Sequence, residues 1–311
     1  MSFSKETKNE LCGAEITSDS CRHSLVYGMV LFSKVFTPSA LSFTTECRPA
    51  AMFYSNTLSS LTSAIVDITV SLTRKGKEKS LFTLSIPDTE DCGRIFDYFG
   101  HVRTAPSLRI NRSNIEDEEC LACFLRGAFL VCGNVTDPEK DYHLEFVVPH
   151  MNLANDLSRI ISEIDVMPIE PNIVRRKGSY IVYIKGSDCI ADMLTYIGAP
   201  MSSLEIVQKK IYKSVRNKVN RQINSETANS NKTALAAAKQ IKAIETIQKT
   251  HGLASLPDEL RELAELRLEN PEYNLRELGE ALSTPISRSG VNHRLTRLMM
   301  IAEEISESTN G

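Results

Sequence analysis

Apolar and polar positions along the first two hundred residues predict one structural unit that occurs twice. The first copy is expected to contain, in chain order, a helix at 20–34, a strand at 40–46, a helix at 48–62, strands at 65–74 and 79–86, and a helix at 88–99. The second copy is expected to contain a helix at 117–132, a strand at 141–148, a helix at 151–164, strands at 167–176 and 178–186, and a helix at 187–197. Each element recurs after roughly 100 residues, which indicates an internal repeat.

The strand segments have the two-residue period of a half-buried sheet. The apolar positions that share a face are Val66, Ile68, Val70 and Leu72 in the first copy and Leu144, Phe146 and Val148 in the second. Polar residues fill the positions between them. This one-sided alternation is typical of antiparallel strands that keep one face in water. A partly polar sheet face is therefore expected.

Beyond residue 200 the strand pattern stops and helical patterns take over. Residues 202–223 read as a basic amphipathic helix, and residues 234–249 have strong helix propensity. The Asn-rich segment 224–233 between them reads as an ordered turn or a linker. After Gly252 and Pro257 interrupt the pattern, three further helices are expected, at 258–269, 274–282 and 287–305.

The last two of these helices have the pattern of a helix-turn-helix. Leu275, Leu278 and Leu282 share a face of the first helix, and Pro285 ends it because the residue before a proline avoids helical geometry. The second helix packs through Val291, Leu295 and Leu298. A short helix, a tight turn and a second amphipathic helix form the motif that places a recognition helix in the DNA major groove.

The polar face of the second helix carries hydrogen-bonding side chains and arginines but no acid. Such side chains can contact base edges and phosphates. The predicted DNA-binding residues are Ser287, Arg288, Ser289, Asn292, His293, Arg294, Thr296 and Arg297. The alternative interpretation is an ordinary three-helix bundle whose basic face is simply solvated.

Charge is distributed unevenly along the chain. Residues 1–200 hold 20 Lys and Arg against 25 Asp and Glu, whereas residues 205–251 hold ten against three. A local basic block favours contact with a polyanion. The candidate phosphate contacts in it are Lys213, Arg216, Lys218, Arg221 and Lys232. A merely solvated helix is the alternative interpretation of this block.

Composition is that of an ordinary globular protein, with 42% hydrophobic and 24% charged residues. The apolar stretch at 25–32 is too short to span a bilayer, and the first ten residues lack the apolar core of a signal peptide, so a cytoplasmic location is expected. Of eight cysteines only Cys120 and Cys123 form a CxxC pair, and no second pair follows. We therefore expect reduced, buried thiols, with no metal site and no cofactor.

Two segments, "LVYGMVLFS" at 25–33 and "LRGAFLVCG" at 125–133, resemble the motif helices of the LAGLIDADG homing endonuclease fold. In that fold the two helices pack together at a pseudo-twofold axis, and small residues such as Gly28, Gly127 and Ala128 allow close approach. Two longer strings, "NRQINSETANSNKT" at 220–233 and "PISRSGVNHRL" at 285–295, resemble the WhiA family, and this resemblance runs essentially end to end.

The resemblance implies an α+β fold in which a pseudo-twofold LAGLIDADG-like αββαββα repeat is followed by an all-α helix-turn-helix domain. The expected domains are 1–105 and 106–222 for the two halves, and 223–311 for the helical domain, with the helix-turn-helix at about 274–307. It also implies a sequence-specific, DNA-binding transcriptional regulator of cell division and chromosome segregation, linked to sporulation in some relatives. The implied partners are double-stranded DNA and RNA polymerase with its sigma factor, or other division proteins. Its location would be the nucleoid.

Nuclease chemistry is not expected. In the nuclease family an acid near the end of each motif helix binds the catalytic metal, and magnesium requires hard oxygen ligands. The corresponding positions here hold Phe32 and Cys132, preceded by Val30 and Leu130. Asp137 follows in a turn, and the acids at 116–119 suit a helix N-terminus. Two alternatives remain: a metal-dependent endonuclease, and a scaffold whose acidic first 200 residues dock proteins while DNA binding is weak.

Overall fold

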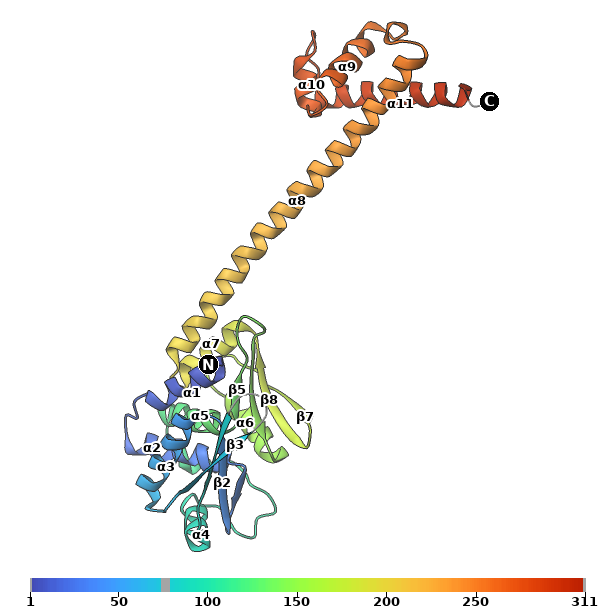
Figure 1. Cartoon of the computed structure of the whole chain (residues 1–311). Coiled ribbons are helices and arrows are strands. Elements are labelled where there is room, and N and C mark those ends of the chain that lie inside the picture. The colour runs from blue at the N-terminus through green and yellow to red at the C-terminus, as the bar shows by residue number, and fades with distance from the viewer. Residues whose placement is uncertain (1, 74–78, 310–311) are drawn as a thin grey trace. The chain divides into compact units, whose positions relative to one another are not determined.

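The computed structural model describes residues 2–73 and 79–309 of the chain (Figure 1). The chain divides into two compact units, Met1–Ser214 and Val215–Gly311. The first unit contains both sheets, and the second is entirely helical over its described residues. The expected α+β fold class is confirmed.

The two halves of the N-terminal unit repeat the same order of elements. The first half consists of α2 (Asp19–Leu31), β1 (Val35–Thr37), β2 (Ala40–Thr45), α3 (Arg48–Thr62), β3 (Asp67–Thr73), β4 (Lys79–Ser85) and α4 (Thr89–Tyr98). The second half consists of α5 (Glu118–Cys132), β5 (Gly133–Val135), β6 (His143–Val148), α6 (Met151–Ser162), β7 (Asn172–Arg176), β8 (Ser179–Lys185) and α7 (Ser187–Tyr196). The sheets have matching orders, β1-β2-β4-β3 and β5-β6-β8-β7, and every pairing in them is antiparallel. The αββαββα repeat is thus confirmed.

Helices α2 and α5 lie beside each other in the core of this unit (Figure 1). Their glycines meet reciprocally. A Cβ added to Gly28 would lie 2.2 Å from the carbonyl oxygen of Phe124, and a Cβ added to Gly127 would lie 2.1 Å from that of Leu25. No side chain fits in either place, so glycine is required for this backbone contact. The expected packing of small residues at the internal twofold is confirmed.

Two strands and one α-helix of this unit were missing from the predicted set. The strands β1 and β5 contain only three residues each, too few to show an alternating pattern. Helix α1 (Phe3–Gly13) buries Phe3, Thr7 and Leu11, which are spaced by one helical turn. The polar threonine in that series weakens the apolar pattern, and the helix therefore escapes detection.

One predicted sheet face is only partly buried. Val66 and Ile68 pack against the core as expected, but Val70 and Leu72 are exposed, with 52% and 68% of their surface accessible. These two residues pair with Phe82 and Ser80, near the Thr73 end of β3 and away from buried Leu84. In β6, by contrast, Leu144, Phe146 and Val148 are fully buried. The predicted Arg74 end of β3 lies outside the described residues.

The predicted interruption at residues 224–233 is wrong. This segment lies inside one continuous helix, α8 (Pro200–Thr250). Residues 201–250 contain neither glycine nor a second proline to stop a helix. The side-chain amide of Gln222, just before the Asn-rich segment, donates to the carboxylate of Glu226 within it at 2.9 Å, and the hydroxyl of Thr233 donates to the carbonyl of Asn229 at 3.0 Å. Local hydrogen bonds of this kind are compatible with a solvated helix.

The C-terminal unit is completed by three helices around a separate apolar core. They are α9 (Asp258–Glu269), α10 (Leu275–Ala281) and α11 (Arg288–Thr309). Ile244 and Ile247 of α8 join Leu260 and Leu263 of α9 in this core, together with leucines of the last two helices. The positions of these helices agree with the pattern of leucines in the sequence.

Candidate nucleic-acid interface

The junction of α10 and α11 is held by a cap, a glycine and a turn. Asn274 begins α10 with a capping box, in which its side chain accepts from the backbone amide of Glu277 and the Glu277 carboxylate accepts from that of Asn274. The chain then folds back, and the amide of Ile286 donates to the carbonyl of Gly279 at 3.1 Å. A Cβ at Gly279 would lie 2.4 Å from the carbonyl oxygen of Ile286, so only glycine permits this turn.

The predicted apolar faces of both helices are buried except at Leu275, which is only partly buried. Leu278 and Leu282 of this helix pair, with Val291, Leu295 and Leu298, are each at most 4% exposed. Their burial fixes the rotation of α11 about its axis and leaves its opposite face in solvent. The helix-turn-helix geometry therefore follows from five apolar side chains and one glycine.

Seven of the eight predicted DNA-binding residues are exposed on the other face. They are Ser287, Arg288, Ser289, Asn292, His293, Thr296 and Arg297. The hydroxyl of Thr296 donates to the carbonyl of Asn292 at 2.8 Å, which leaves the threonine methyl and its oxygen lone pairs for contact. Ser287 accepts from the amide of Gly290 at 3.2 Å and so caps the start of the helix. Residues 284–297 contain no Asp or Glu, so this face is cationic.

Arg294 is placed differently from the other seven. Its guanidinium lies 2.7 Å from the Glu259 carboxylate of α9, and its side chain is only 23% exposed. A helical wheel puts Arg294 at the edge of the polar face, but the acid on α9 draws it toward the neighbouring helix. This arginine links α11 to α9 instead of standing open to solvent.

The predicted phosphate contacts also divide into two groups. Lys213 lies in the N-terminal unit, where its ammonium donates to the carbonyl of Pro138 at 2.7 Å and stacks over the Tyr142 ring at 4.8 Å. The others, Arg216, Lys218, Arg221 and Lys232, are exposed residues of α8 within the C-terminal unit. Lys213 is therefore already engaged, whereas the other four cations face solvent.

Sequence reasoning missed a cavity of about 500 Å³ in the C-terminal unit. It lies among α8, α9, α10 and α11 and includes Arg267 and Arg276 as well as Lys232, Arg288 and Asn292. Arg276 was not singled out because it sits in the acidic stretch 258–280. The signal that could have revealed it is its position in the first turn of α10, next to the polar face of α11.

The ends of the motif helices carry no chemistry for a metal. Phe32 is buried at the end of α2, and Val30 and Leu130 are buried within the helix pair. Burial raises the pKa of the Cys132 thiol at the end of α5 to about 12, against the opposing charge of Lys8. Burial lowers the pKa of Lys8, which faces thiols instead of carboxylates. A neutral thiol beside a lysine is a poor site for Mg²⁺.

No group of three or more His, Cys, Asp or Glu side chains within residues 2–73 and 79–309 is arranged to hold a metal ion. Asp137 accepts from the amide of Glu139 at 2.9 Å in a turn. Asp117 caps α5 by accepting from the amide of Cys120 at 2.8 Å, and Glu118 and Glu119 follow in the first turn. These acids therefore stabilise a turn and a helix start.

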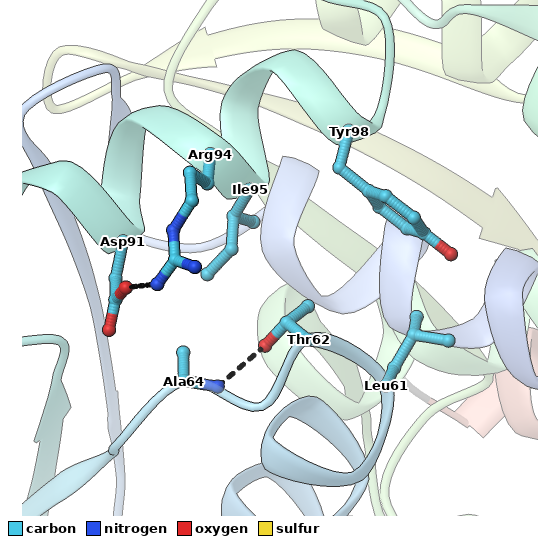
Figure 2. A pocket seen from close by; sticks show the side chains of 7 residues that line it. All are labelled: Leu61, Thr62, Ala64, Asp91, Arg94, Ile95 and Tyr98. Carbon is cyan, nitrogen blue, oxygen red and sulfur yellow. Dashed lines mark hydrogen bonds and ion pairs between the residues drawn. The ribbon is translucent and has the colours of Figure 1, made fainter.

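A small pocket of about 150 Å³ lies beside α4 (Figure 2). It is lined by residues from the end of α3 and from α4, and its single carboxylate, Asp91, is paired with Arg94. Thr62 accepts a hydrogen bond from the amide of Ala64, as Figure 2 shows. The lining therefore offers one acid, which is neutralised by its partner, and the hydroxyl of Tyr98, which lies 3.2 Å from Nδ1 of His23.

Together the two units define a protein that joins a LAGLIDADG-like fold to a helix-turn-helix. Comparison with known proteins agrees with this class. Residues 121–216 match the WhiA LAGLIDADG-like domain, and residues 219–302 match the WhiA C-terminal HTH domain. The chain belongs to the WhiA family.

Curated relatives match along the full length. The "Probable cell division protein WhiA" of Clostridium botulinum is 36% identical over 99% of both chains. The protein of the same name from Clostridium beijerinckii is 37% identical over 99% of this chain and 100% of its own. The crystal structure of full-length WhiA from Thermatoga maritima is similar over 98% of this chain and 99% of its own, with 28% identity and a TM-score of 0.59.

Within the described residues, no helix combines the length and the apolar character that crossing a membrane requires.

Proposed function

We propose that this protein is a sequence-specific DNA-binding transcriptional regulator of cell division, in which α11 reads the major groove. The observation that carries this proposal is the exposed face of α11, where Ser289, Asn292, His293 and Arg297 stand in solvent without an acid nearby in sequence. Amide and guanidinium groups on a recognition helix are the side chains that discriminate base edges. The names of the curated relatives support a role in cell division.

The finer parts of the proposal follow from that role. Regulation of chromosome segregation, and of sporulation in some relatives, would act through the same DNA contact at the nucleoid. RNA polymerase with its sigma factor is a proposed second partner, since one helix-turn-helix often needs an additional contact to bind stably. The eight predicted residues of α11 and its preceding turn remain the proposed DNA-binding set, with Arg294 acting by holding α11 to α9.

A salt titration of DNA binding tests this proposal. Full-length protein is titrated onto a fluorescent duplex selected by the protein from a random library, and Kd is followed by anisotropy between low and physiological salt. Affinity should fall steeply with salt, because each neutralised phosphate adds about 0.9 to the slope of log affinity against log salt. Absence of binding at low salt contradicts the proposal.

Two variants and a control separate base-specific recognition from electrostatic attraction to the phosphates. Asn292→Ala should remove about 1–3 kcal/mol of discrimination at one base pair, because it deletes an amide that contacts a base edge. Arg297→Ala should reduce the salt slope by about one. Arg261→Gln is the matched control, since its guanidinium pairs with Asp258 at 2.5 Å within α9 and it is not one of the predicted contacts. Equal effects of all three would reject the assignment.

We also propose that the protein does not cleave DNA. The basis of this proposal is that the positions of the metal-binding acids hold the buried apolar residues Val30, Phe32 and Leu130 and the partly buried thiol of Cys132. Supercoiled plasmid incubated with the protein and Mg²⁺ or Mn²⁺ should remain supercoiled. Nicking by the wild-type protein that is lost in an Asp137→Asn, Glu118→Gln double variant would contradict it.

A further inference from the structure

The cavity of about 500 Å³ in the C-terminal unit is lined by cations and amides. Lys232, Arg267, Arg276 and Arg288 supply four positive charges from four different helices. Gln240, Asn274 and Asn292 add neutral amides, and the lining contains no Asp or Glu. A concave site with several cations and no acid attracts an anion strongly, because its walls limit screening by water.

Arg267 gives this cavity a buried charge that lacks an acid. Its residue surface is 2% exposed, and its guanidinium donates to the side-chain oxygen of Gln240 at 2.9 and 3.1 Å and to the carbonyl of Tyr273 at 2.5 Å. No carboxylate among the described residues forms an ion pair with it, and Glu272 acts on it only through its charge. Burial lowers the pKa of Arg267, and the charge of Glu272 opposes this shift.

The other three cations are accessible to a ligand. Lys232 and Arg288 are exposed and form no ion pair with any described residue. Arg276 pairs with Glu280 at 2.8 Å, but both side chains are more than half exposed. Such a surface pair contributes little and is easily exchanged for a stronger partner. Three exposed donors can therefore converge on one anion over a buried guanidinium.

The chemistry and the location favour a phosphate group. Guanidinium and ammonium groups together match phosphate, which accepts several charge-assisted hydrogen bonds at once. Arg288 and Asn292 belong both to this cavity and to the proposed reading face of α11. We propose that the cavity binds a phosphate of the DNA backbone and thereby sets the register of α11 on the duplex. This inference rests on the proposed function.

The test compares a variant that lacks two cations of the cavity, one on α8 and one on α10, with a control variant on α8. Lys232→Gln combined with Arg276→Gln removes two exposed cations and leaves buried Arg267 in place, so the fold is preserved. Lys242→Gln is the control, because Lys242 is exposed on α8 but does not line the cavity. For wild type, the cavity variant and the control, Kd and its dependence on salt concentration are measured on the selected duplex and on an unrelated duplex of equal length.

The cavity variant should lose about one unit of salt slope and bind both duplexes about five- to tenfold more weakly near physiological salt, because one phosphate contact is lost. The preference of the protein for its selected duplex should be unchanged, and Lys242→Gln should behave as wild type. A cavity variant that matches Lys242→Gln on DNA overturns the inference. If wild type binds neither duplex, the proposed function itself fails.

A second arm identifies the source of the phosphate. Thermal unfolding is followed with inorganic pyrophosphate and, for comparison, with chloride at equal ionic strength. Pyrophosphate should stabilise wild type and the Lys242→Gln control more than the cavity variant. Loss of this stabilisation in the cavity variant, with no change in its DNA slope, would overturn the backbone assignment in favour of a free phosphate compound.

Discussion

The helix pair α2–α5 and the helix pair α10–α11 are both built on glycines at points of backbone contact. In the first pair, a Cβ at Gly28 or Gly127 would lie about 2 Å from a carbonyl oxygen of the facing helix. In the second, a Cβ at Gly279 would lie 2.4 Å from the carbonyl oxygen of Ile286. Both pairs use glycine at a close backbone contact, but they differ in how far their helices are exposed to solvent.

The first pair is buried on nearly all sides, whereas the second keeps one face in water. From Leu25 to Leu31, every residue of α2 is buried. In α11, the residues between the buried Val291, Leu295 and Leu298 are mostly exposed and polar. A helix can bind a ligand only through side chains that it leaves accessible. The helices α2 and α5 therefore stabilise the fold, whereas α11 has one face packed in the core and one face exposed to solvent.

The largest expected effect comes from filling the contact in the first pair. Gly127→Ala would force α2 and α5 apart, because its Cβ overlaps the Leu25 carbonyl. We expect a loss of about 3 kcal/mol in unfolding free energy and a fall in Tm of roughly 10 °C. Calorimetry measures both.

Gly13→Ala is the matched control, since a Cβ at Gly13 has no neighbour within 4 Å. It should leave Tm nearly unchanged. Equal stability of the two variants would mean that α2 and α5 are not in backbone contact.

The second prediction fills the corresponding contact in the other pair. Gly279→Ala should destabilise only the C-terminal unit, by about 2 kcal/mol, and weaken DNA binding because α11 loses its fixed orientation. Hydrogen exchange should accelerate in residues 275–298 and stay the same in residues 19–31. Gly290→Ala is the control, because a Cβ there lies 3.4 Å from the Ile286 side chain, an ordinary contact. Faster exchange in both regions would reject independent packing of the two units.

A smaller effect separates two arginines of α11. Arg294→Gln breaks the pair with Glu259 and should cost less than about 1 kcal/mol of stability, while the salt slope of DNA binding stays constant. Arg297→Gln should leave the free energy of unfolding unchanged and lower the salt slope of DNA binding by about one. Chemical denaturation and anisotropy measure the two quantities. A lower slope for Arg294→Gln would show that its pair with Glu259 opens on DNA.

The smallest effect is a pH dependence confined to the N-terminal unit. Burial lowers the pKa of His101, and its Nε2 is buried without a hydrogen-bond partner among the described residues. The unfolded chain then takes up a proton first as pH falls below about 6.5, so stability declines from there toward the lower folded pKa. His101→Phe should flatten this decline in unfolding midpoints measured from pH 8 to 5. An unchanged decline would exclude His101 as its source.

Sequence reasoning located the elements that show a regular spacing of apolar residues, and it missed the features that depend on contacts between residues distant in sequence. Leucines at one-turn spacing located α10 and α11 correctly. The Asn-rich segment at 224–233 read as a linker because its polar residues favour turns, yet nothing in it stops a helix. Arg294 was predicted to contact DNA and Arg267 was not singled out, because their partners, Glu259 and Gln240, are distant in sequence. The cavity could not be predicted for the same reason.

The most direct test of the central claim is photo-crosslinking of the full-length protein to its selected duplex. A photoreactive amino acid is placed at His293, in the middle of the exposed face of α11, or at Val70, on the exposed part of β3 in the N-terminal unit. The account predicts a crosslink to DNA from position 293 and none from position 70. Crosslinking from position 70 with none from position 293 would contradict it.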